Sequence, residues 1–148
     1  KLQIMNKKIL TIFTSFILAI FIQDLAHAEK SYFEEGKNLF DIKKYKDSKF
    51  YFEKDIVFNP KSENSYLYLA KIFKEEKKDN LEENNLNTVL LLNPKNEEAI
   101  YLLTLLNIKK SNFSKANELI LTLTSVCVKM CSAKKKLKEK LDSSQKSK

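Results

Sequence analysis

An Asn-Pro pair occurs twice in the chain, as Asn59-Pro60 and Asn93-Pro94, and each pair ends a stretch whose apolar residues have helical spacing. The period between the pairs, about 34 residues, is typical of proteins built from stacked structural repeats. The 148 residues include one Gly and two Pro, so few residues would interrupt a helix. We therefore expect an all-α fold, an α-solenoid in which each repeat unit supplies one pair of helices.

The repeat is visible when residues 29–62, 63–96 and 97–130 are aligned. Large apolar residues recur at the fourth and twenty-fourth positions, and smaller residues stand at the eighth. Smaller residues at one fixed position allow the two helices of a pair to approach closely. The aligned residues are Tyr32, Tyr66 and Ile100; Gly36, Ala70 and Thr104; Phe52, Leu86 and Ile120; and, at the thirty-second position, Pro60, Pro94 and Val128.

These positions resemble the tetratricopeptide repeat (TPR) family, whose pattern has an aromatic residue, a Leu, a small residue and a Tyr in the first helix. The second helix of that pattern carries an Ala and an aromatic residue before a closing Pro. The resemblance covers about a hundred residues and implies three helix-turn-helix repeats. The second repeat departs from the pattern, because Glu82 stands where the third repeat has Ala116. A plain helical bundle with accidental spacing is the alternative.

Local chemistry sets the expected helix boundaries. Ser62 and Asn96 stand where N-caps should precede the second and third repeats. Residues 129–141 place Leu137 and Leu141 on one face and most lysines elsewhere, which predicts a helix that caps the solenoid. Residues 131–148 are thus the remainder of this basic capping helix, with a frayed tail from Ser143. The other helices are expected over 31–43, 47–58, 63–77, 80–92, 97–109 and 113–125.

Residues 1–28 have the layout of a secretory signal peptide, with extra residues before Met5. Lys7 and Lys8 precede fourteen uncharged residues, Ile9 to Ile22, and Ala26-His27-Ala28 resembles a cleavage site. Cleavage after Ala28 would leave Glu29 as the first residue of an exported protein, and we expect the bacterial periplasm as its location. The alternative is an uncleaved anchor and a protein held at the inner membrane, although the apolar run is shorter than the about 20 residues that span a bilayer.

Charge is distributed unevenly along the chain. Residues 29–128 contain equal numbers of basic and acidic residues, whereas 129–148 contain eight Lys and two acidic residues. The chain has no Arg, the residue best suited to bidentate contacts with bases and phosphates. We therefore expect no specific nucleic-acid binding. The lysines of the C-terminus leave a weak contact with an anionic membrane surface as an alternative.

The residue inventory argues against most catalytic chemistry. His27 is the only His, and cleavage after Ala28 would remove it, so no imidazole would remain for acid-base catalysis or metal binding. A single Gly cannot form a glycine-rich phosphate loop. We therefore expect a binding protein that is not an enzyme and has no cofactor.

Cys127 and Cys131 lie where the last repeat meets the capping helix. In an exported protein an even pair of cysteines favours a disulfide, but residues four apart on an intact helix are too distant, so the helix would have to break there. Two inert core thiols are one alternative. The other is a soft-metal or redox site, since Cys127, Met130 and Cys131 could bind Cu(I), which would make this a thiol- or copper-handling protein.

The resemblance to the TPR family implies a concave groove lined by the first helices of the repeats. Such a groove would bind an extended or helical segment of a protein or peptide partner. Phe33, Tyr101 and Ile108 could instead be packing residues between repeats. Nothing in the sequence indicates an oligomeric state. The groove candidates are Phe33, Lys37, Phe40, Leu67, Lys71, Lys74, Tyr101, Leu105 and Ile108.

Overall fold

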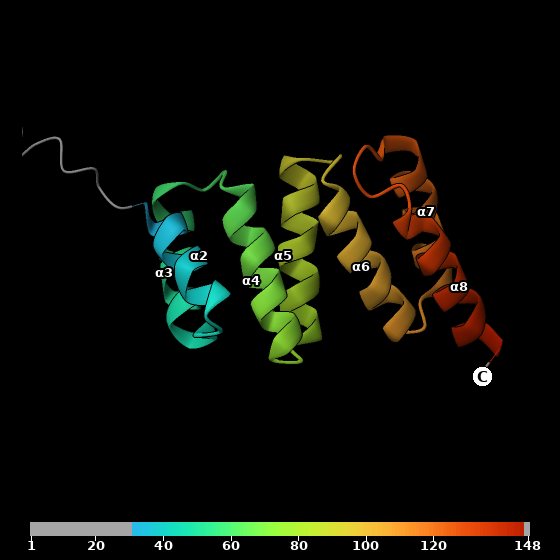
Figure 1. Ribbon diagram of the computed structural model, residues 1–148, viewed down its shortest axis with the longest axis horizontal. Helices are drawn as coiled ribbons and strands as arrows, with labels where there is room; N and C mark the ends of the chain where they lie inside the picture. Colours follow the sequence, from blue (N-terminus) through green and yellow to red (C-terminus); the bar gives the residue numbers. More distant parts are fainter. Residues whose placement is uncertain (1–30, 147–148) are drawn as a thin grey trace, which may run out of the picture. The chain divides into compact units, whose positions relative to one another are not determined.

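A computed structural model describes residues 31–146, which form seven helices and no strand (Figure 1). The expected signal segment, residues 1–28, and the last two residues of the chain lie outside the described residues. The helices are α2 (Tyr32–Asp41), α3 (Tyr45–Phe58), α4 (Glu63–Glu75), α5 (Asp79–Leu92), α6 (Glu97–Lys109), α7 (Phe113–Val126) and α8 (Ala133–Lys146).

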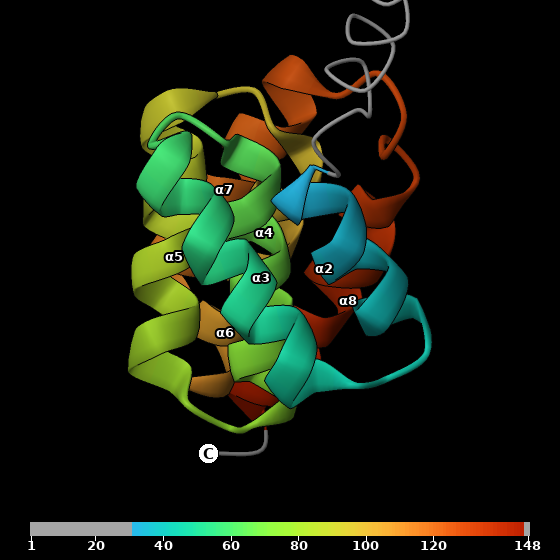
Figure 2. The ribbon, with the colours of Figure 1, turned by 90° about the vertical axis from the view of Figure 1, so that its left-hand side faces the viewer.

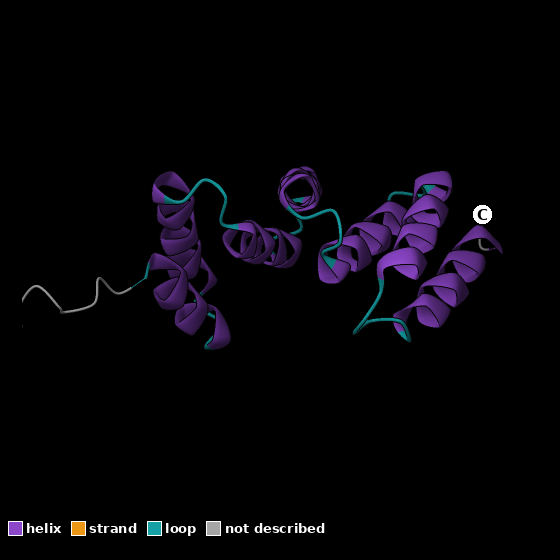
Figure 3. Ribbon diagram, turned by 90° about the horizontal axis from the view of Figure 1, so that it is seen from above, coloured by secondary structure: helices purple, strands orange, loops and turns teal. Residues whose placement is uncertain are grey.

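Helices that follow one another in the sequence pack as pairs, α2 with α3, α4 with α5 and α6 with α7. The pairs follow one another in a row, and α8 packs on α6 and α7 (Figures 1 and 3). Seen end-on, α2 and α8 lie on one side of the row and α5 on the other (Figure 2). This arrangement confirms the expected all-α solenoid.

The helices repeat with the period read from the sequence. α3, α5 and α7 have 14 residues each, and their first residues, Tyr45, Asp79 and Phe113, are separated by that same period. The first helices of the pairs end at the same spacing, at Asp41, Glu75 and Lys109. Only one of the two expected N-caps forms its side-chain hydrogen bond. Asn96 accepts a hydrogen bond from the N–H of Ala99, whereas the hydroxyl of Ser62 instead donates to Ser65.

Each turn within a pair contains one residue with a left-handed backbone. These residues are Lys43, Lys77 and Ser111, with φ between 56° and 61°, and they too are spaced by the period of the repeat. The amide of the following residue donates a hydrogen bond to a carbonyl near the end of the first helix. For example, Lys44 N–H donates to the carbonyl of Leu39 at 2.9 Å. This hydrogen-bonded reversal is a Schellman motif, and it offsets the cost of the left-handed residue. It turns the second helix back along the first.

The first helix pair meets closely at Gly36. A β-carbon added at Gly36 would lie 2.8 Å from the ring of Phe52, and the hydroxyl of Ser48 donates to the Gly36 carbonyl at 2.7 Å. Ala70 and Thr104, at the same position of the later repeats, are fully buried. The smaller residues read from the alignment therefore stand where the helices need them.

The core has two parts. The smaller one joins the first two repeats through Phe52, Leu69, Ile72 and Phe73. The larger one continues from the second repeat into α8, where Leu137 and Leu141 are each 1% exposed, as expected of a cap. No helix of the described residues is long and apolar enough to span a membrane.

The capping helix differs from its expected bounds. It begins at Ala133 rather than at about residue 129, because residues 127–132 form a loop that includes a disulfide between Cys127 and Cys131. It also continues to Lys146, where a frayed tail from Ser143 was expected. The hydroxyl of Ser143 donates to the carbonyl of Lys140 within this extension.

Candidate functional site

The candidate groove is formed by the first helices of the repeats, and an ion pair joins two of them. Lys71 of α4 lies 2.8 Å from Glu98 of α6, and its ammonium group also lies 4.5 Å from the ring centre of Tyr68. The stripe of α4 that carries Lys71 and Lys74 therefore faces the same side as the stripe of α6 that carries Glu98, Tyr101 and Leu105.

Four of the predicted groove residues serve mainly to pack the repeats. Phe33 and Phe40 contact Tyr68, with ring centres 5.7 and 5.0 Å apart, in the core between the first two repeats. Leu67 and Ile108 are 5% and 3% exposed. The packing alternative therefore describes Phe33 and Ile108 better than a groove role. Lys37 stays half-buried and pairs with Asp41 on its own helix.

A cavity of about 320 Å³ opens among the first helices near their C-terminal ends. Lys74 and Leu105, two of the predicted groove residues, line it from α4 and α6. Tyr101 and Lys71 lie one turn away from them on the same two helices and are half-buried. The full lining is Lys74, Glu82, Leu105, Leu106, Lys109 and Lys140, from four helices.

Glu82 is the unusual member of this lining. It occupies the position where the third repeat has Ala116, and it is only 4% exposed. Burial raises the pKa of its carboxyl group above the ordinary value, and Lys74 and Lys109 partly offset that rise. Sequence reading recorded Glu82 as a departure from the repeat pattern but did not assign it to the groove.

Only one of the three lysines that line the cavity forms an ion pair with a described residue. Lys109 lies 2.6 Å from Asp79 of α5. Of the residues that the structure describes, none forms an ion pair with Lys74 or Lys140. The cavity therefore combines an apolar wall with an excess of positive charge, a combination that suits a ligand with both apolar and acidic groups.

The disulfide loop is attached to the third repeat by Glu97. The carboxylate accepts hydrogen bonds from the amides of Val128 at 2.8 Å, Lys129 at 3.0 Å and Met130 at 2.6 Å. These bonds, that of Met130 above all, lower the pKa of Glu97 from its ordinary value. Sequence reading assigned Glu97 to the first turn of a helix and missed this role.

A signal for the role of Glu97 is present in the alignment. Glu63 occupies the same position of the preceding repeat, and its carboxylate accepts a hydrogen bond from the side chain of Asn93 at 3.2 Å. The first residue of each of these two repeats thus holds the loop that ends the repeat. Glu29 occupies this position in the first repeat but lies outside the described residues.

The described residues contain no cluster of potential metal ligands. Among residues 31–146, no group of three or more His, Cys, Asp or Glu side chains could hold a metal ion. Cys127 and Cys131 are joined to each other, with their α-carbons 5.2 Å apart. Copper binding would require this bond to be reduced first.

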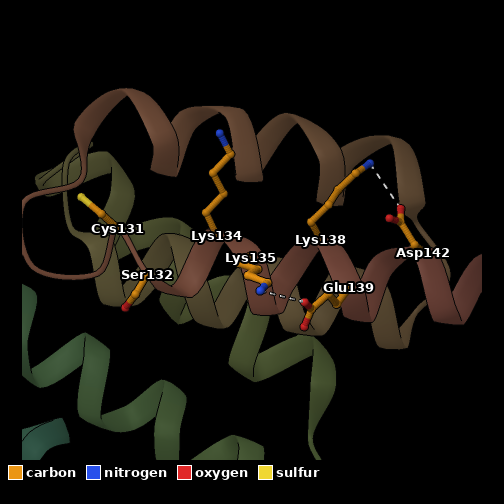
Figure 4. Close-up of a pocket in the computed structure, with 7 residues that line it drawn as sticks. All are labelled: Cys131, Ser132, Lys134, Lys135, Lys138, Glu139 and Asp142. Atoms are coloured by element: carbon orange, nitrogen blue, oxygen red, sulfur yellow. Dashed lines mark ion pairs between the residues drawn. The ribbon is translucent and has the colours of Figure 1, made fainter.

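A second cavity, of about 480 Å³, lies on α8 beside the disulfide loop. Lys134 and Lys138 extend from the helix on the same side, and Lys138 pairs with Asp142 at 3.3 Å (Figure 4). Lys135 pairs with Glu139 at 4.0 Å. Because most of its charged groups pair with each other, this cavity offers a ligand fewer free charges than the cavity of the groove. Its lining is Cys131, Ser132, Lys134, Lys135, Lys138, Glu139 and Asp142.

Comparison with known proteins finds no matching family model and no similar curated protein sequence. The fold is similar to that of SycD, a type III secretion chaperone of Yersinia enterocolitica. The structure of SycD in complex with a peptide of the translocator YopD has a TM-score of 0.69 at 11% identity, covering 78% of this chain and 91% of that chain. An alternative SycD dimer has a TM-score of 0.67 at 12% identity, covering 78% and 90%. The chain therefore has a TPR-like helical solenoid fold.

Proposed function

We propose that this protein is an exported, non-enzymatic TPR scaffold that binds a protein or peptide partner in the bacterial periplasm. The observation that carries the proposal is the cavity lined by α4, α5, α6 and α8. Its lining joins two leucines to three lysines and a buried glutamate, which suits a peptide that carries both apolar and charged side chains. Similarity of fold to SycD, solved with a translocator peptide, supports this choice.

Two features support the periplasm as the location. Residues 1–28 have the order of charged, apolar and small residues that signal peptidases require. Cys127 and Cys131 are close enough to bond, and disulfides persist in oxidising compartments. An intact mass of protein from the cell envelope, alkylated without reductant, tests both features. Export predicts a chain that begins at Glu29 with neither cysteine alkylated, whereas a full-length chain with two alkylated cysteines would overturn export.

Binding is tested with a peptide selected from a random library against the purified protein. We expect Lys71→Glu combined with Tyr101→Ala to weaken binding of that peptide by roughly tenfold or more, because both side chains lie one turn from the cavity lining, on α4 and α6. Lys95→Glu, which changes an exposed lysine in the loop between repeats, is the matched control. Circular dichroism should show that all variants remain folded. Undiminished binding by the double variant would place the site elsewhere.

A further inference from the structure

We infer that the cavity between α4, α6 and α8 binds a peptide segment in which an acidic side chain is adjacent to an apolar one. This inference rests on the proposed function and adds the chemistry of the partner. The apolar half of the site is made by Leu105 and Leu106, consecutive residues of α6 that line the cavity. An apolar side chain of the peptide would be removed from water against them.

Three lysines that line this cavity come from three different helices. Lys74 comes from α4, Lys109 from α6 and Lys140 from α8, so the positive charge is assembled by the fold and not by one run of lysines. Lys109 is paired with Asp79, but none of the described residues pairs with Lys74 or Lys140. A carboxylate of the ligand could form an ion pair with these two lysines.

Glu82 adds a negative charge to the same cavity. The residue is 4% exposed and lines the cavity, and its carboxyl group interacts electrostatically with Lys74 and Lys109. The charged groups around it are Asp79 on its own helix, Lys74 on α4 and Lys109 on α6. Lys140 of α8 lines the same cavity.

The arrangement makes the site sensitive to protons. A ligand carboxylate would compete with Glu82 for Lys74 and Lys109 and would add a like charge nearby. Both effects favour the protonated form of Glu82, whose pKa is already raised by burial. Binding should therefore be coupled to proton uptake, with acidic ligands held more tightly as the pH falls. The effect operates only while the ligand carboxylate itself stays ionised.

The test uses two small probes, N-acetyl-Leu-Glu-amide and N-acetyl-Leu-Gln-amide, which differ only in the charge of one side chain. They are titrated into ¹⁵N-labelled protein while the amide signals of Glu82, Leu105 and Leu106 are followed. We expect the Glu probe to bind roughly three- to tenfold more tightly than the Gln probe. Lys74→Gln combined with Lys140→Gln should remove this preference, and Lys95→Gln should retain it.

The substitution Glu82→Gln should change the affinity for the Glu probe in the opposite direction to the lysine substitutions. Removal of the buried acid should strengthen binding of the Glu probe at neutral pH and abolish its pH dependence, while binding of the Gln probe changes little. A spectrum of the free variant shows whether it is folded, and the lysine variant carries the test if it is not.

Equal affinities for the two probes, or a preference that survives loss of Lys74 and Lys140, would overturn the inference. Signal changes confined to other helices would do the same. If this happens while the selected peptide still requires Lys71 and Tyr101, the proposed function stands and only the acidic specificity fails. If the selected peptide also binds without those residues, the groove is not the binding site, and the acidic specificity and the proposed place of binding both fail.

Discussion

At the scale of single residues, the eighth and twenty-fourth positions of each repeat hold residues of complementary size. Gly36 is paired in this way with Phe52, Ala70 with Leu86, and Thr104 with Ile120, and all six are almost fully buried. Phe52, the largest residue at the twenty-fourth position, thus packs on Gly36, the smallest at the eighth. This compensation follows from close packing, in which the space left by one side chain is filled by another.

Gly36→Ala should destabilise the protein by about 1 kcal/mol, because overpacking costs about 1–3 kcal/mol and the better helix propensity of Ala returns about 1 kcal/mol. The clash is with Phe52, 2.8 Å from the added β-carbon. Adding Phe52→Leu, the residue type of the second repeat, should recover stability, so that the double variant is more stable than Gly36→Ala alone. Urea unfolding measures both. Additive losses would show that the two positions do not interact.

Glu97 should make the end of the solenoid sensitive to acid. Its pKa is lowered in the folded state, so its contribution to stability is fully present above the ordinary value of 4.5 and is lost as the pH falls through the lower, folded value. Glu97→Gln should therefore lower Tm clearly at pH 7 and less at pH 3, below the ordinary pKa of the carboxyl group. Thermal melts at the two pH values give the comparison, and an equal Tm difference at both would contradict the role of the carboxylate.

At the scale of the elements, the sequence predicted most helices within a few residues. The reason is local, since Pro60, Pro94 and the polar residues around them end one helix and begin the next through backbone effects. The start of α8 could not be read in this way. It depends on Glu97, in the first turn of α6, which fixes the amides of residues 128–130 outside a helix.

The candidate site was predictable to a smaller extent, for a similar reason. The periodic alignment placed Lys74 and Leu105 on the face that holds the cavity. It could not show that Phe33 and Phe40 would pack on Tyr68, nor that Lys140 of α8 would line the same cavity as Lys74. Both facts depend on the angle between neighbouring helix pairs, which the spacing of apolar residues does not specify.

The disulfide should stabilise the junction between α7 and α8. Closing so short a loop contributes about 2 kcal/mol in the chain-entropy account. Replacing Cys127 and Cys131 by Ser should lower the free energy of unfolding by about this amount, and reductant should have the same effect on the unchanged protein. Binding of the selected peptide should persist, because neither cysteine lines the cavity of the groove. Unchanged stability would mean that the bond does not form in solution.

At the scale of the whole molecule, the solenoid brings together side chains that lie far apart in the sequence. Lys74 and Lys140 meet at one cavity because α8 packs against α6 at the end of the row. The capping helix thus closes the core and also contributes to the candidate binding surface. Solenoids of this kind serve many tasks, so the chemistry of the groove, and not the fold, decides what is bound.

Site-specific photo-crosslinking in the producing cell shows whether a peptide partner lies in the groove of α4, α6 and α8. A photoreactive amino acid replaces Leu105, which lines the cavity, or Leu121, which is 62% exposed on α7. We predict that Leu105 gives a defined crosslinked partner, identified by mass spectrometry, and that Leu121 does not. A partner crosslinked from Leu121 and never from Leu105 would mean that the peptide binds on another face of the solenoid.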